Sequence, residues 1–321
     1  MKNLRSLFAL LCLSFAVSAF AQTYPNKPVK IIVPFPPGQA TDTLARLIGE
    51  KLSTAMGQPF VIDNRPGAGG VLGTEAAARA APDGYTLVMA PISSFSINVA
   101  LQPNLPYVPL RDFAPLSNIG LTPQVIMVNP KSGITSLKDL IAKAKAKPGE
   151  LFYASSGNGS ASHLAMESLQ LAAGIKLTHV PFKGNSDAFT QVIGGQIPII
   201  SDAVPGAVPQ VKGGKLNALG VASLQRSPYL PDVPTVAEQG YPGFEVVGWI
   251  GIAAPAKTPE PILDRLNAEI RKALEQPDVK EKLTAASFVT AGGSRSEFTE
   301  FIRAETARWT KVVKEANVKA D

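Results

Sequence analysis

The sequence predicts an α/β fold of two lobes, with a mostly parallel β-sheet covered by helices on both faces. Short apolar runs typical of strands alternate with amphipathic helical patterns along almost the whole chain. After an N-terminal leader about 300 residues remain, enough for two domains. The alternation starts afresh near Thr122, which places a junction between the lobes there.

The first 21 residues are typical of a secretory signal peptide. Lys2 and Arg5 form a short basic segment, an apolar run follows from Leu7 to Val17, and Ala19-Phe20-Ala21 is a small-x-small cleavage pattern. The apolar run is shorter than the roughly 20 residues of a membrane-spanning helix. We therefore expect cleavage after Ala21 and export of the remainder.

Charge and cysteine content exclude several kinds of site. The exported part has 29 basic and 25 acidic residues, a net charge of +4, because the leader contains two bases and no acid. This mild, scattered bias favours anionic ligands but does not indicate nucleic-acid binding. The only cysteine, Cys12, lies in the leader, and the two histidines, His163 and His179, lack metal-ligand spacing. We expect no metal and no cofactor.

The first lobe is predicted from the patterns before residue 122. Its strands are expected at residues 29–33, 60–62 and 85–90, and its helices at 41–56, ended by Gly57, and at 74–81. A glycine-rich loop, residues 64–73, precedes the second helix.

The second lobe follows the same alternation. Its strands are expected at 125–128, 151–154, 178–182, 197–201 and 217–222, and its helices at 136–146, 160–173 and 186–193. An apolar run at 244–254 precedes helices at 259–275 and 296–316, which we expect to pack back on the first lobe. We assign residues 22–122 and 246–321 to lobe 1 and residues 123–245 to lobe 2.

Several strand-to-helix junctions share one chemistry: they are rich in Gly, Ser, Thr and Asn and poor in charge. In open parallel sheets, ligands bind beyond the carboxyl ends of the strands. Helix N-termini there present free N–H groups and a partial positive charge. A small anion is therefore the expected ligand.

The first junction is PFPPGQATD, residues 34–42. Its prolines fix φ and remove hydrogen-bond donors, which makes the loop stiff. Thr41 or Asp42 can cap the following helix. A capping role for Asp42 competes with a ligand-binding role, because a carboxylate repels an anionic ligand.

The second junction is NRPGAGGVLG, residues 64–73. A dinucleotide fingerprint would need a third glycine at the position of Leu72, and no Gly-Lys-Ser/Thr follows for a P-loop. The glycines are better explained by close approach of the backbone to a neighbour or a ligand. Arg65 could bind a carboxylate or form a structural ion pair.

The third junction is YASSGNGSASHL, residues 153–164. Ser160 or Ser162 is expected to cap a helix. Further hydroxyl and amide groups come from Ser155, Ser156 and Asn158. The stretch lacks the G-x-S-x-G of a hydrolase, and His163 suits packing at the helix start better than general-base catalysis.

Two other strand ends carry polar groups. Ser93 and Ser94 follow the strand that ends at Ala90, and Asp202 follows the strand at 197–201. Asp202 could hold an amino group or a water molecule, or could cap a turn.

These junctions, in this order, resemble the extracytoplasmic solute receptors of tripartite tricarboxylate transporters, called Bug or TctC-like proteins. Four further stretches carry the resemblance: APDGYTL at 81–87, VPFKG at 180–184, LPDVPTVAEQG at 230–240 and WIGIAAPAKTP at 249–259. Together the seven stretches span nearly the whole exported chain.

The resemblance implies a periplasmic binding protein fold, in which two Rossmann-like lobes joined by crossover strands close around a ligand cleft. It implies periplasmic localisation and a small carboxylate ligand, which could be a di- or tricarboxylic, aromatic or amino acid. The implied partners are membrane subunits of such a transporter, and no nucleic acid. The ligand-binding residues expected are Phe35, Gln39, Thr41, Asp42, Ser93, Ser94, Ser155, Ser156, Asn158, Ser160 and Asp202.

The chain departs from the family at Gln39, where the common first loop, PF-x-P-G-G-x-x-D, has its second glycine. Either the loop path changes or Gln39 contacts the ligand. Residues 91–95 are less polar than is usual in the family, which favours a ligand with an apolar or aromatic body. Two other classes stay open: an exported enzyme on the same scaffold, using carboxylates such as Asp42 and Asp202, and a sensor subunit that signals to a membrane kinase.

Overall fold

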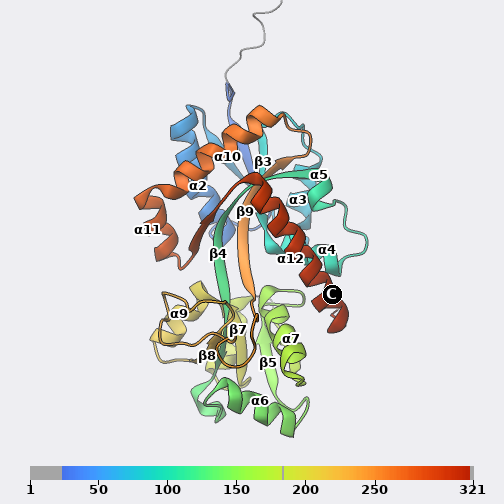
Figure 1. The fold of residues 1–321 in the computed structure, drawn as a ribbon, viewed down its shortest axis with the longest axis vertical. Coiled ribbons are helices and arrows are strands. Elements are labelled where there is room, and N and C mark those ends of the chain that lie inside the picture. The colour runs from blue at the N-terminus through green and yellow to red at the C-terminus, as the bar shows by residue number, and fades with distance from the viewer. Residues whose placement is uncertain (1–23, 183, 319–321) are drawn as a thin grey trace, which may run out of the picture.

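The computed structural model describes residues 24–182 and 184–318, so the predicted signal peptide, residues 1–21, lies outside the described residues. Figure 1 shows two α/β parts stacked along the long axis of the molecule, joined by the long strands β4 (Phe113–Val128) and β9 (Val247–Pro255). The described chain begins in the upper part and the lower part contains the middle of the chain, whereas the C-terminal helix α12 (Arg295–Glu315) runs from the upper part down to the side of the lower part.

The strands form one curled sheet in the order β2-β1-β3-β9-β4-β7-β5-β6, with β8 and β10 also paired to β4. The remaining strands are β1 (Val29–Val33), β2 (Phe60–Asn64), β3 (Thr86–Pro91), β5 (Phe152–Ser155), β6 (Thr178–Pro181), β7 (Ile199–Ala203), β8 (Asn217–Val221) and β10 (Val289–Gly292). The α/β prediction is confirmed.

The expectation of a mostly parallel sheet was wrong. β1 runs parallel to β2 and β3, and β5 runs parallel to β6 and β7. All pairings of β4 and β9 are antiparallel, including those with β7 and β3. The sheet is mixed because these two strands carry the chain between the lobes and lie at the centre of the strand order.

β4 belongs to both halves of the sheet. It pairs with β9 from Phe113 to Pro123 and with β7 from Gln124 to Val128. The expected strand at 125–128 is only its last quarter, and the restart expected near Thr122 lies inside a continuous strand. β4 therefore changes its pairing partner between Pro123 and Gln124, and the assignment of residues 123–245 to lobe 2 stays a prediction.

The helices cover both faces of the sheet. They are α2 (Ala40–Met56), α3 (Val71–Ala78), α4 (Asn98–Leu101), α5 (Pro109–Asp112), α6 (Leu137–Ala146), α7 (Ala161–Ala173), α8 (Asn185–Ile193), α9 (Val204–Lys212), α10 (Glu260–Glu275), α11 (Pro277–Ala285) and α12 (Arg295–Glu315). Short 3₁₀ or π turns lie at η2 (Ala68–Gly70), η3 (Ser93–Ile97) and η4 (Pro130–Ser132).

Two helix starts differ from the prediction. Gln39 is the N-cap of α2, so Thr41 and Asp42 lie in the first turn and neither is the cap. α3 begins at Val71, three residues before the expected Thr74, because the left-handed backbone of Gly70 lets the helix start directly after the glycine loop. Ser160 caps α7 as expected, with its hydroxyl accepting a hydrogen bond from the His163 N–H.

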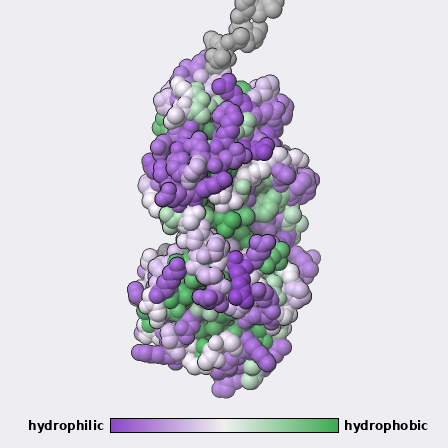
Figure 2. Space-filling view, turned by 60° about the vertical axis from the view of Figure 1, so that its left-hand side comes forward, coloured by the Kyte–Doolittle hydropathy of each residue, from purple (hydrophilic) through white to green (hydrophobic). Residues whose placement is uncertain are grey.

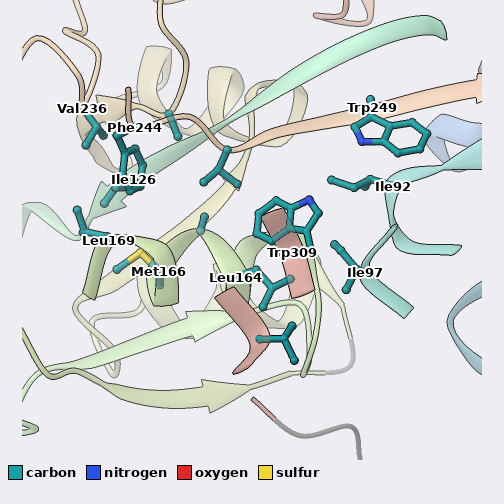
Figure 3. Close-up of a cluster of buried hydrophobic side chains, with 14 of the residues drawn as sticks. Ile92, Ile97, Ile126, Leu164, Met166, Leu169, Val236, Phe244, Trp249 and Trp309 are labelled. Atoms are coloured by element: carbon teal, nitrogen blue, oxygen red, sulfur yellow. The ribbon is translucent and has the colours of Figure 1, made fainter. Parts of the chain in front are cut away.

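The C-terminal helices connect to both lobes. α10 packs on α2, whereas α12 packs on β4 and η3 and also contacts α7 of lobe 2. Figure 3 shows Trp309 of α12 between Leu164 of α7 and the region of Trp249 and Ile92. Glu305 is buried there and accepts hydrogen bonds from the indole N–H groups of Trp249 and Trp309. The packing expected on lobe 1 therefore extends to lobe 2.

Candidate functional site

Two adjoining cavities lie between the lobes and share Phe35, Ser93 and Ser156 in their walls. The smaller cavity has a volume of about 300 Å³ and the larger one about 790 Å³. We call them together the cleft. Figure 2 shows the outline of the molecule narrowing between its upper and lower parts, where hydrophobic residues are exposed.

Helix starts from both lobes meet in the smaller cavity. Gln39, Ala40 and Thr41 bring the N-terminus of α2 from lobe 1, and Ala161 and Ser162 bring the N-terminus of α7 from lobe 2. The two helices have 17 and 13 residues, long enough to carry a partial positive charge at their starts. Free N–H groups and hydroxyls from both lobes therefore face one space that suits a small anion.

Asp42 shapes the first loop instead of lining the cleft. Its Oδ2 accepts from the Gly38 N–H at 2.9 Å and from Arg46 Nε at 2.9 Å, and its Oδ1 accepts from Asn64 Nδ2 at 2.9 Å. The same Asn64 amide donates to the Phe35 carbonyl at 3.1 Å. Burial raises the pKa of Asp42, but these hydrogen bonds outweigh burial, so the net pKa lies below its usual value. The carboxylate stays charged and holds the loop.

The glycine loop brings α3 against the first junction. An added Cβ on Gly73 would lie 2.6 Å from the Arg65 carbonyl oxygen and 2.8 Å from Pro34 Cα, so only glycine fits there. Ala68 and Gly69 of the same loop line the larger cavity. Close backbone approach, as expected, accounts for Gly73, whereas Gly69 adopts a left-handed backbone with φ of 63°. Arg65 forms an ion pair with Asp63 at 3.0 Å and does not line the cleft.

Serine hydroxyls form the wall that the third junction contributes. Ser162 Oγ accepts from the Ser156 N–H at 3.0 Å and lies 3.1 Å from Ser156 Oγ and 2.9 Å from Ser160 Oγ. Ser156 lines both cavities, Ser162 the smaller one, and Ser160 and Asn158 the larger one. The cluster presents several hydroxyls that can turn their protons toward an anion.

Ser155 lies behind this wall and is fully buried. Its hydroxyl lies 2.6 Å from His179 Nε2 and accepts from the Gly157 N–H at 3.1 Å. His163 stacks on His179 with ring centroids 3.8 Å apart, and its Nδ1 accepts from the Gly159 N–H at 3.0 Å. This Ser–His pair resembles a nucleophile and its base, but Ser155 lines neither cavity, so a substrate in the cleft does not reach it.

The segment after β3 contributes one serine to the cleft and one to the core. Ser93 lines both cavities, whereas Ser94 is fully buried and its carbonyl accepts from the Tyr107 hydroxyl at 2.9 Å. Pro91 and Ile92 form an apolar part of the smaller cavity's wall. Ser94 therefore supports the turn and has no surface in the cleft.

Asp202 lines the smaller cavity from lobe 2 and is 4% exposed. Its Oδ1 accepts from Asn185 Nδ2 at 2.8 Å and from the Ala203 N–H at 2.8 Å. Its Oδ2 is buried and has no hydrogen-bond partner among the described residues. Burial raises the pKa of Asp202 to about 7.

Several residues that line the cleft were not predicted from the sequence. Thr122 and Gln124 come from β4, Gly248, Trp249 and Ile250 come from β9, and Asn185 begins α8. The larger cavity also takes Asn98, Leu101, Gln102, Pro103 and Asn104 from α4 and the loop after it. The predicted lobe boundary at residue 122 was the one signal that could have indicated the β4 residues.

The described part of the chain shows neither a metal-binding cluster nor a membrane-spanning helix. Residues 24–182 and 184–318 contain no group of three or more His, Cys, Asp or Glu side chains placed to hold a metal ion. Within the same residues, no helix has the length and apolar character that crossing a bilayer requires.

A family model described as the tripartite tricarboxylate transporter family receptor, TctC, matches residues 44–318. BugT of Bordetella pertussis is 39% identical over 305 residues, which cover 95% of this chain and 94% of that protein. Among solved structures, Rpa4515 of R. palustris with adipate is 35% identical, with a TM-score of 0.81 and coverage of 92% of this chain and 99% of that chain. MatC of Rhodopseudomonas palustris with bound malate is also 35% identical, with a TM-score of 0.77 and coverage of 90% and 100%.

Proposed function

The chain belongs to the tripartite tricarboxylate transporter receptor family, and we propose that it captures one small carboxylate in the cleft and delivers it to a transporter of that type. The receptor itself carries out no chemical step in this account. Binding stabilises the closed arrangement of the lobes, and the membrane subunits recognise that arrangement.

The observation that carries the proposal is the meeting of α2 and α7 N-termini from opposite lobes at the smaller cavity. A carboxylate placed there accepts N–H and O–H donors from both lobes at once. Thr41 contributes from lobe 1, and Ser156 and Ser162 contribute from lobe 2. One anion can therefore hold the two lobes together, which is the step that a receptor of this kind needs.

Two relatives support the ligand class. Rpa4515 is described with adipate and MatC with malate, and both ligands are dicarboxylates. In this chain, Pro91, Ile92, Trp249 and Ile250 form an apolar wall beside the donors. We propose a carboxylate with an apolar or aromatic body, one end held by the helix starts and the remainder against this wall.

We propose export to the periplasm through residues 1–21, with cleavage after Ala21. A receptor that serves a membrane transporter from the periplasm needs such a route. Mass spectrometry of the protein from the periplasmic fraction should give a chain that begins at Gln22, and a retained leader would contradict the proposal.

The test is a thermal-shift screen of protein that has been unfolded, dialysed and refolded to remove carried-over ligand. The panel holds adipate, malate, citrate, benzoate, nicotinate and glutamate, each with its amide as a matched neutral analogue. A ligand that binds only the folded protein raises the melting temperature. We expect a shift with at least one acid and none with its amide; no shift with any acid would contradict the proposal.

A further inference from the structure

We propose that the cleft binds its carboxylate together with one proton, and that Asp202 is the group that takes up this proton. The inference rests on the proposed function, because it concerns the same cleft and the same class of ligand. It assigns Asp202 a defined part in binding: its protonation removes a negative charge from the wall against which an anion must lie.

The surroundings of its carboxyl group support this role. Oδ1 already accepts two N–H donors, from Asn185 and Ala203, whereas Oδ2 accepts none from the described residues. Oδ2 is therefore the oxygen that can carry a proton without breaking an existing hydrogen bond. An added Cβ on Gly206 would lie 2.2 Å from Oδ2, so the glycine at the start of α9 makes room for this oxygen.

No positive side chain compensates Asp202 in the described structure. The elements around β7 carry few titratable groups, and the hydrogen bonds to Asp202 come from the uncharged donors Asn185 and Ala203. These titratable groups are Tyr153 on β5, His163 and Glu167 on α7, Asp187 on α8 and Lys212 on α9. β4 carries none along its whole length, and the first junction of lobe 1, which lines the same cavity, contains Asp42, which is paired with Arg46.

The described lining of the whole cleft likewise supplies no positive side chain to compensate Asp202. Among the described residues that line its two cavities there is no Lys, Arg or His, and Asp202 is the one ionisable side chain. Helix starts and hydroxyls can hold one carboxylate, but a second negative charge in a cavity of about 300 Å³ meets no cation. Two carboxylates that share such a space cannot both stay ionised at low cost, so one of them takes a proton.

Even without ligand, burial raises the pKa of Asp202 to about 7, so this carboxyl group gains or loses its proton close to neutral pH. A bound anion raises the pKa of Asp202 further. Between the pKa of the free and of the bound protein, binding takes up one proton, and the dissociation constant rises by up to about tenfold per pH unit. The receptor should therefore bind its ligand more tightly as pH falls from 8.5 toward 7.

The experiment is isothermal titration of adipate and malate, and of any other acid that the screen identifies, between pH 6.5 and 8.5. At pH 8, titrations in triethanolamine and in Tris, whose ionisation enthalpies differ and which add no small anion to compete for the cleft, count the protons taken up on binding. We expect uptake approaching one proton and affinity at pH 8.5 at least about fivefold weaker than at pH 7.

Two variants separate Asp202 from other causes. Asp202→Asn should bind with an affinity that is nearly independent of pH, and should bind at least as tightly as the wild type at pH 8.5. Asp187→Asn makes the same change of charge at an exposed position of α8 outside the cleft and should retain the wild-type pH dependence. Even if Asp202→Asn does not fold, a wild type that takes up no proton on binding would overturn the inference.

Equal heats in the two buffers together with a pH-independent dissociation constant would overturn the inference and leave the carboxylate receptor intact. A pH dependence that persists unchanged in Asp202→Asn would also overturn it. Binding of no carboxylate at any pH would refute the proposed function and this inference with it.

Discussion

Asp42 and Asp202 are both buried, yet the pKa of Asp42 is lowered and the pKa of Asp202 is raised. Both side chains are at least nine-tenths buried. Asp42 receives donors on both oxygens, so it is held in the charged form and stiffens the first loop. Burial raises the pKa of Asp202, whose Oδ2 has no hydrogen-bond partner among the described residues. One carboxylate therefore serves the fold and the other can respond to what enters the cleft.

For Asp42, the folded-state pKa is depressed, so its stabilisation is present above the unfolded pKa, near 3.8, and is lost as pH falls through the folded value. Asp42→Asn should lower the free energy of unfolding at pH 7 by about 1–2 kcal/mol, since it weakens hydrogen bonds to a charged group. The difference between variant and wild type should shrink below about pH 4. Urea unfolding of both proteins at pH 7 and pH 3 measures this difference in the free energy of unfolding. A difference of equal size at both pH values would contradict a stabilising role for the charged Asp42 carboxylate.

At the scale of elements, the three strand-to-helix junctions could be predicted from the sequence, because a strand end followed by Gly, Ser or Thr and a helix has a local signature. Most of the predicted ligand-binding residues line the cleft: Phe35, Gln39, Thr41, Ser93, Ser156, Asn158, Ser160 and Asp202. Ser94, Ser155 and Asp42 do not, because adjacent residues at a strand end point to opposite sides or turn back to cap the loop. No local pattern distinguishes the two orientations.

The crossing strands could not be predicted in the same way. β4 contains Pro115, Asn118, Gly120 and Pro123, which are typical of loops, and it accommodates them with register shifts along β9. Thr122 and Gln124 therefore looked like residues of a connection. α9 was missed for a related reason, since Pro205 stands in its first turn and Pro209 inside it.

The contact between α3 and the first loop can be tested at Gly73. Gly73→Ala places a methyl group against the backbone of Arg65 and Pro34, and backbone atoms cannot move aside cheaply. We expect a loss of about 1–3 kcal/mol in the free energy of unfolding. Weaker ligand binding should accompany it, because Phe35 follows Pro34 into the cleft. Thermal melts and titrations measure both effects, and wild-type values in both would show that the contact is unimportant.

At the scale of the whole molecule, the connections between the lobes set how far the cleft can close. β4 and β9 run between the two parts, and α12 reaches from lobe 1 to α7 of lobe 2 (Figure 1). Arg308 Nη1 pairs with Glu305 at 2.9 Å, and Arg308 Nη2 donates to the Glu245 carbonyl, so side chains tie α12 to the segment that enters β9. We therefore expect the proposed closure to pivot about these strands, with the α12 contacts either kept or shifted.

Small-angle X-ray scattering should detect this closure. Addition of a saturating carboxylate should lower the radius of gyration, because the lobes approach each other around the ligand. The amide analogue at the same concentration serves as the control. An unchanged radius of gyration with a ligand that is shown to be bound would mean that the lobes do not close on it.

The measurement that tests the central claim most directly compares one acid with its amide by isothermal titration in four proteins. These are the wild type, Thr41→Val from lobe 1, Ser162→Ala from lobe 2 and a control, Ser168→Ala, which lies on α7 but outside the cleft lining. If the carboxylate is held by helix starts from both lobes, the wild type should prefer the acid by at least about tenfold, and each cleft variant should lose part of that preference. Equal affinities for acid and amide, or a preference that neither cleft variant changes, would contradict the account.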